Sequence, residues 1–221
     1  MLDGWPTEGG DTIAPERKPR LVVGITGASG AVYGIRILEL LHRYGLAETH
    51  LVISRGGKWT IHDETSLSVN DVEALADHSY RDNDLGAAIA SGSFPVDGMI
   101  IAPCSVKTLS GVTNSYDENL VVRAADVTLK ERRRLVLLLR ETPLHAGHLR
   151  LMTRAAEAGA IIMPPVPAFY SNPSTIEDLV VHTVGRALDL FELRLPGLRR
   201  WGQDHPRDIH HAPAEENGAR S

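Results

Sequence analysis

Residues 21–30 read LVVGITGASG, and this stretch decides the fold. The apolar run at 21–25 has the length and composition of a buried β-strand, and it leads directly into a turn of small residues. Beyond the turn, apolar residues recur at helical spacing, at Val32, Ile35, Leu38 and Leu41. The pattern predicts a strand, a tight turn and a helix, in that order.

The same alternation continues along the chain. Further apolar runs predict strands at 51–53, 98–103, 135–139 and 160–163, and helical periodicity covers 119–130, 144–158 and 175–193. Ser174 or Thr175 is the expected cap of the last helix. Because near-continuous apolar strands alternate with helices, we expect an α/β fold in which helices cover both faces of a parallel sheet.

One domain accounts for this pattern, from about residue 20 to residue 203. Residues 1–19 are rich in Gly, Pro, Asp and Glu, and residues 204–221 are polar and rich in His. Neither segment has apolar periodicity, so both are expected to be flexible tails.

The composition excludes several classes of protein. The formal net charge of −5 argues against a nucleic-acid partner, because nucleic-acid-binding proteins usually carry a basic excess. The single cysteine, Cys104, rules out an internal disulfide and fits a reducing cytoplasm. The apolar stretches fall far short of the roughly 20 residues of a membrane helix, and the N-terminus lacks a secretory signal pattern. We expect a soluble cytoplasmic protein with no membrane partner.

In such a fold the ligand lies beyond the carboxyl ends of the strands. The first segment there, Gly27 to Gly30, allows a phosphate to approach the backbone at a helix N-terminus. It lacks the Lys of a P-loop, and the second strand ends in Ser54-Arg55 without the carboxylate of a dinucleotide site. A mononucleotide site with Ser54 as a neutral donor is favoured, although the glycines alone are equally consistent with tight packing.

Two further segments follow apolar strands. Ser105 and Thr108 offer hydroxyl groups at the start of a helix, and Cys104 beside them is better interpreted as buried and inert than as a nucleophile. Arg140-Glu141 would suit binding an anionic leaving group and protonating it, or would form a salt bridge that closes the loop. Residues 132–134 are interpreted mainly as a solvated helix end. The histidines form no recognisable metal set.

The order and spacing of several motifs resemble the UbiX flavin prenyltransferases over about residues 20–193. The motifs are 27–30, 90–93, 103–105, 123–126 continuing through 130–133, 140–141 and 164–170. Leu139 departs from the family, which often has proline there. The resemblance implies a flavodoxin-like, three-layer fold in a homo-oligomer, often a dodecamer, with ligands held at subunit contacts.

The resemblance also implies an activity. Family members transfer dimethylallyl from its monophosphate, or in some members the diphosphate, to N5 and C6 of reduced FMN without a metal. The product, prenylated FMN, serves a UbiD-type decarboxylase. Two alternatives remain: an FMN-binding enzyme of the cysteine decarboxylase type, and a non-catalytic flavin carrier subunit of an aromatic acid decarboxylase.

Site residues follow by position from the resemblance. The FMN positions are Gly27, Ala28, Ser29, Ser54, Ser105, Val106, Lys107, Thr108 and Arg123. The dimethylallyl phosphate positions are Lys130, Arg140, Tyr170 and Arg186, and the catalytic positions are Ser29, Glu64, Lys130, Arg140 and Glu141. Among these, Glu141 is the expected acid for the departing phosphate, Glu64 is expected to assist proton transfer during ring closure, and Ser29 to relay a proton at N5.

Overall fold

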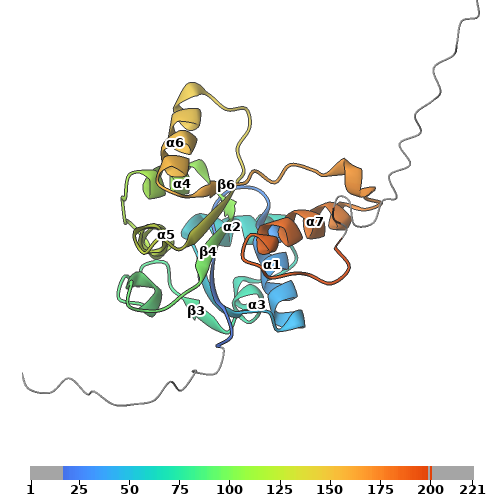
Figure 1. Ribbon diagram of the computed structural model, residues 1–221, viewed down its shortest axis with the longest axis horizontal. Helices are drawn as coiled ribbons and strands as arrows, with labels where there is room; N and C mark the ends of the chain where they lie inside the picture. The colour runs from blue at the N-terminus through green and yellow to red at the C-terminus, as the bar shows by residue number, and fades with distance from the viewer. Residues whose placement is uncertain (1–16, 199, 201–221) are drawn as a thin grey trace, which may run out of the picture.

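The computed structural model describes residues 17–198 and residue 200 (Figure 1). Within them, six strands form one sheet in the order β3-β2-β1-β4-β5-β6, and all neighbouring strands are parallel. The strands are β1 (Arg20–Ile25), β2 (Glu48–Ile53), β3 (His78–Tyr80), β4 (Gly98–Cys104), β5 (Arg134–Leu139) and β6 (Ile161–Ile162). The predicted parallel α/β sheet is confirmed.

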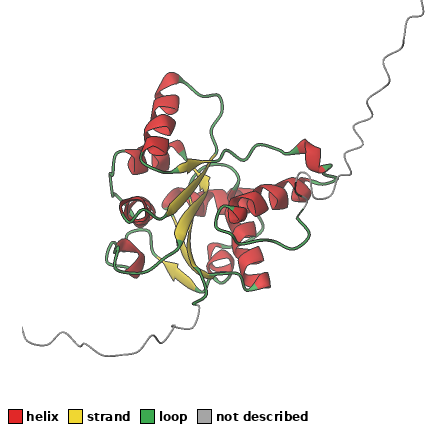
Figure 2. Cartoon of the chain, in the orientation of Figure 1, coloured by secondary structure: helices red, strands yellow, loops and turns green. Residues whose placement is uncertain are grey.

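Helices lie on both sides of this sheet, so the three-layer arrangement is also confirmed (Figure 2). The α-helices are α1 (Ala31–Tyr44), α2 (Arg55–Glu64), α3 (Val69–Glu73), α4 (Val106–Thr113), α5 (Leu120–Lys130), α6 (Ala146–Glu157) and α7 (Ile176–Asp189). Two short 3-10 helices, η1 (Ala88–Ala90) and η2 (Phe169–Ser171), lie in connections.

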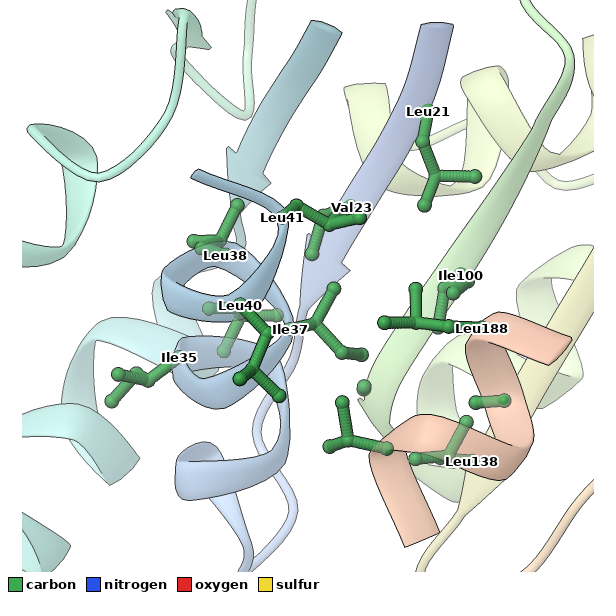
Figure 3. Close-up of a cluster of buried hydrophobic side chains, with 14 of the residues drawn as sticks. Leu21, Val23, Ile35, Ile37, Leu38, Leu40, Leu41, Ile100, Leu138 and Leu188 are labelled. Atoms are coloured by element: carbon green, nitrogen blue, oxygen red, sulfur yellow. The ribbon is translucent and has the colours of Figure 1, made fainter. Parts of the chain in front are cut away.

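The sheet is apolar on both faces because alternate side chains of each strand point to opposite sides. Val23 of β1 and Ile100 of β4 pack with Leu38 of α1 and Leu188 of α7 (Figure 3). On the other face, Val22 packs in a second cluster with residues of α4 and α5. Strands β1, β4 and β5 are therefore buried on both sides, which is why their sequences are almost continuously apolar.

The elements missing from the sequence prediction lack an apolar pattern of their own. Strand β3 reads HSY and pairs only with β2 at the edge of the sheet. Helix α2 buries only Gly57 and Ile61. The cap of α7 is Thr175, which with Asp178 forms a reciprocal capping box, but the helix ends at Asp189 rather than at residue 193.

Parts of the expected tails lie outside the described residues, namely 1–16 and 204–221, and so do residues 201–203 at the end of the expected domain. Arg17 is described, and its side chain forms an ion pair of 2.8 Å with Asp97. Across the part of the chain that the structure describes, none of the helices has the length and apolar character to cross a membrane.

Gly34 of α1 lies in close contact with the sheet. A Cβ atom there would fall 2.7 Å from Cγ1 of Ile25 and against the carbonyl oxygen of Ala102. We expect Gly34→Ala to lower the free energy of unfolding by about 1–3 kcal/mol, because the backbone of β4 would have to shift to make room for the added methyl group. Urea denaturation would measure the loss. Gly86→Ala, where the nearest atom would be 3.6 Å away, is the matched control and should be nearly neutral; equal losses in both variants would contradict the packing argument.

Candidate active site

A cleft of about 1340 Å³ opens at the carboxyl edge of the sheet. It is bordered by the segments that follow β1, β2, β4 and β5, as the rule for parallel sheets predicts. The predicted site residues that line it are Gly27, Ser54, Ser105, Val106, Lys107, Thr108 and Glu141. Small-molecule sites commonly have about 300–1,000 Å³. This cleft therefore has room for a mononucleotide and a second small ligand.

The floor of the cleft is built where two backbones meet. A Cβ atom on Gly27 would lie 2.9 Å from Cα of Gly56, and one on Gly57 would lie 2.9 Å from the carbonyl carbon of Ile25. The packing interpretation of the first glycine turn is therefore correct. The same close approach leaves a shallow surface of backbone groups, which is the kind of surface that a phosphate or a flat ring can approach.

Two helix N-termini face this floor. Ser54 caps α2 and accepts a hydrogen bond from Gly57 N at 3.1 Å. Ser105 caps α4 in the same way, accepting from Thr108 N at 3.2 Å, and its hydroxyl lies 3.1 Å from that of Thr108. Backbone N–H groups and the positive ends of two helix dipoles thus converge on one cleft, which suits an anionic group.

The N-terminus of α1 is different, because a carboxylate already occupies it. Glu64 Oε2 accepts hydrogen bonds from Gly30 N at 2.8 Å and from Ala31 N at 2.9 Å. Free N–H groups for a phosphate were expected here, and these two are not free. The contact instead holds the carboxylate of Glu64 beside the turn that carries Ala28 and the exposed Ser29.

Arg140 and Glu141, at the end of β5, have different surroundings. Arg140 lies close enough to Tyr33, in the first turn of α1, to affect its hydroxyl: burial raises the pKa of Tyr33, and the Arg140 charge partly offsets this rise. Glu141 lines the cleft and accepts a hydrogen bond from Thr142 N at 3.1 Å. Within the described residues no ion pair joins Arg140 to Glu141, so the loop-closing salt bridge is not formed.

Lys130 lies at the far end of α5 from the cleft. Asn119 and Val122, at the start of α5, line the cleft, while Lys130 is its last residue. At 1.5 Å per residue, the length of the helix separates them by about 15 Å. Lys130 is half exposed and pairs with Glu131 beside Gly92.

Arg123 is likewise absent from the lining of the cleft. Its guanidinium donates to Ala90 O at 3.1 Å and to Asp117 at 3.0 Å. It therefore ties α5 to the end of η1 and to the loop that precedes α5. The guanidinium of Arg133, which follows α5, donates to Gly92 O at 2.8 Å and to Phe94 O at 2.9 Å. Arg133 is therefore not the solvated residue that the sequence suggested.

Tyr170 and Arg186 are not among the residues that line the cleft. Tyr170 belongs to η2, at the tip of a long arm between β6 and α7 that extends from the body (Figure 1), and its hydroxyl is 3.3 Å from Nε2 of His182. Arg186 forms an ion pair with Asp189 at 2.7 Å. One chain therefore brings together the predicted FMN residues of the cleft but not the predicted set of cations.

Two aromatic residues at the cleft were missed by the sequence analysis. Trp59 of α2 and Tyr116, which precedes α5, both line it and are 69% and 65% exposed. Large aromatic side chains left in water beside a cleft can stack on a flat ring. An isolated Trp in a segment without a clear apolar face was the available signal. His145 is the N-cap of α6, where its side chain accepts a hydrogen bond from Gly147 N.

Cys104 is fully buried at the end of β4, and burial raises the pKa of its thiol to about 12. The inert interpretation is therefore confirmed. We expect alkylation by iodoacetamide at pH 8 to be more than about 10³-fold slower in the native chain than in the unfolded chain, because so little thiolate forms. Labelling with and without guanidinium chloride would measure this. Comparable native and denatured rates would show that the thiol is accessible.

The sequence of this chain is similar to those of known flavoproteins. The family model Flavoprotein matches residues 12–187. Flavin prenyltransferase UbiX of Salmonella typhimurium is 58% identical over 177 residues, which make up 80% of this chain and 94% of that protein.

Solved structures agree. A crystal structure of AnUbiX (PadA1) in complex with FMN and dimethylallyl pyrophosphate has a TM-score of 0.82 at 51% identity, over 84% of this chain and 98% of that one. The dodecameric FMN-dependent UbiX-like decarboxylase of Escherichia coli O157:H7 has a TM-score of 0.81 at 50% identity, over 82% and 98% of the two chains. The resemblance seen in the motifs is confirmed, and the chain belongs to the UbiX flavin prenyltransferases, within the Flavoprotein family.

Proposed function

We propose that this chain is the flavin prenyltransferase that joins a dimethylallyl group to N5 and C6 of reduced FMN, with FMN held in the cleft. The observation that carries the proposal is the convergence of the N-termini of α2 and α4 on a cleft that also contains the carboxylate of Glu141, which forms no ion pair within the described part of the chain. FMN supplies an electron-rich ring that captures an allylic cation. The residues around FMN bind it and transfer the protons of the reaction.

The cleft residues have separate tasks in this proposal. The N–H groups and hydroxyls at Ser54, Ser105 and Thr108 bind the phosphate and ring edge of FMN, together with Gly27, Ala28, Val106 and Lys107. Glu141 donates a proton to the bridging oxygen of the allylic phosphate as the carbon–oxygen bond breaks. Ser29 and Glu64, adjacent at the first turn, relay protons in both steps. One proton leaves N5 as the first bond forms; in ring closure one proton is delivered to the alkene carbon and another is lost from C6.

The predicted cations that lie far from the cleft in one chain would come from neighbouring subunits. Ionising an allylic phosphate needs positive charge on the leaving group, which Lys130, Arg140, Arg186 and the hydroxyl of Tyr170 would supply, with Arg123 reaching the FMN of a neighbour. The distance between Lys130 and the cleft in one chain supports a homo-oligomer, proposed to be a dodecamer. The arm between β6 and α7 supports it too, since Val166 and Phe169 are about 70% exposed or more. A subunit contact would bury them.

The product, prenylated FMN, would pass to a UbiD-type decarboxylase. We also propose a cytoplasmic location, because the reaction needs reduced FMN and Cys104 is a free thiol.

The test is anaerobic incubation of the protein with reduced FMN and dimethylallyl phosphate, or the diphosphate in parallel, followed by mass spectrometry of the extracted flavin. A gain of one C5H8 unit with release of one phosphate is expected, and an excess of chelator should not reduce it. FMN that binds but leaves unmodified with both donors would instead indicate a flavin carrier, and flavin-dependent decarboxylation of a cysteine peptide would indicate the other alternative.

A further inference from the structure

A second polar cluster lies at the opposite edge of the sheet. Glu48 and His50 point to one face from the start of β2, and His78 points to the same face from the start of β3, because His50 pairs with His78 in the parallel register. The two imidazole rings stack with their centres 4.7 Å apart. The chain from Glu48 to Ser54 runs about 20 Å along β2. The cluster is therefore separate from the cleft.

The distances in the cluster match those of a metal site. Oε1 of Glu48 lies 3.2 Å from Nε2 of His78 and 3.3 Å from Nε2 of His50, and all three atoms lie within 4.8 Å of one another. Ligands at about 2.0–2.1 Å from a tetrahedral Zn²⁺ are separated by about 3.3 Å. The two separations from Glu48 therefore match such a site, and the third, between the two imidazoles, is at most 4.8 Å.

His50 gives an independent indication. Its side chain is 2% exposed, yet Nε2 makes no hydrogen bond of acceptable geometry to any residue that the structure describes. A buried polar atom without a partner is costly, and in native proteins it usually marks an ion, a water or a function. Nε2 is also the atom of the ring that faces Glu48 and His78.

The surroundings of His50 suit a metal ligand. Its other nitrogen, Nδ1, lies 2.9 Å from the hydroxyl of Tyr80. An Nδ1–H donated to that oxygen leaves the lone pair on Nε2, as in the outer contacts that orient metal-binding histidines. Phe94 packs edge-on against the ring. Arg20 donates to Oε2 of Glu48 at 2.9 Å, which leaves Oε1 available.

We propose that Glu48, His50 and His78 bind one divalent metal ion of the Zn²⁺ type, which fastens the edge strand β3 to β2. Imidazole and carboxylate together suit Zn²⁺ better than Mg²⁺ or Ca²⁺. His78 is half exposed, so the ion can enter from solvent, and water completes the coordination. The site is structural and takes no part in prenylation.

Equilibrium dialysis of the chelator-treated full-length protein against Zn²⁺ tests the proposal, with Co²⁺ as a spectroscopic probe of tetrahedral geometry. The sequence also carries His205, His210 and His211, so the protein used has all three replaced by Gln. We expect one Zn²⁺ per chain, a higher melting temperature with the metal, and intense visible bands for Co²⁺. The absence of binding in this protein overturns the proposal.

Variants assign the ligands. His78→Gln should abolish binding of the single Zn²⁺. Tyr80→Phe should weaken Zn²⁺ binding by roughly 10- to 100-fold, because the hydroxyl that orients the ring of His50 is lost. His62→Gln, at a histidine of α2 that is 87% exposed, is the matched control and should bind as the parent does. Flavin prenylation and oligomeric state should be unchanged in His78→Gln, which excludes misfolding. Binding that survives His78→Gln overturns the proposal.

Discussion

Replacement of Glu141 by Gln is expected to slow prenylation by roughly 10²- to 10⁴-fold while FMN still binds. Gln keeps the shape and hydrogen-bonding length of the side chain but cannot donate a proton to the departing phosphate. Since Glu141 lines the cleft and has no ion-pair partner among residues 17–198 and 200, its loss leaves no buried cation behind there, and stability should change little. Single-turnover conversion of reduced FMN, followed by mass spectrometry, measures the rate, and flavin fluorescence titration measures FMN affinity.

Two comparisons sharpen this experiment. Glu118→Gln removes the carboxylate that pairs with Lys107 at the same cleft, at 2.6 Å, and should affect turnover far less. Moreover, a better leaving group should narrow the gap between Glu141→Gln and the parent, because it needs less protonation. A normal rate in Glu141→Gln with dimethylallyl phosphate would remove Glu141 from the mechanism.

The second large effect concerns Lys130. Lys130→Met should lower the rate by roughly 10²- to 10³-fold, since a cation that stabilises the leaving phosphate is lost. In one chain Lys130 lies about 15 Å along α5 from the cleft. The lysine of each site should therefore come from a neighbouring subunit, and this origin can be tested by complementation.

Oligomers co-assembled from Lys130→Met and Glu141→Gln chains should recover activity that neither variant has alone. A site is intact only when its cleft comes from the first variant and its lysine from the second, so about a quarter of the sites recover under random assembly. Differently tagged chains, co-expressed and purified through both tags, provide the mixture. Oligomers that stay as inactive as their parents would mean that both residues act within one chain.

The sequence was enough to predict the sheet and the cleft, because both depend on local patterns. Apolar strands followed by small or hydroxyl residues identify the carboxyl edge, and Ser54, Ser105 and Thr108 all lie there. The prediction was less successful where contacts join distant residues. Nothing near Glu64 indicates that it accepts hydrogen bonds from the start of α1, 33 and 34 positions earlier. The same is true of Arg133 and the loop at Gly92, and of the polar strand β3.

The carboxylate of Glu64 at α1 also bears on ligand discrimination. In dinucleotide-binding α/β folds, the pyrophosphate rests on the N-terminus of the first helix. Here the protein supplies its own anion at that position, bound through Gly30 N and Ala31 N. A pyrophosphate would meet like charge there and find these donors already engaged. We therefore expect FAD and the nicotinamide dinucleotides to bind more weakly than FMN, because Glu64 occupies the position that their pyrophosphate would need.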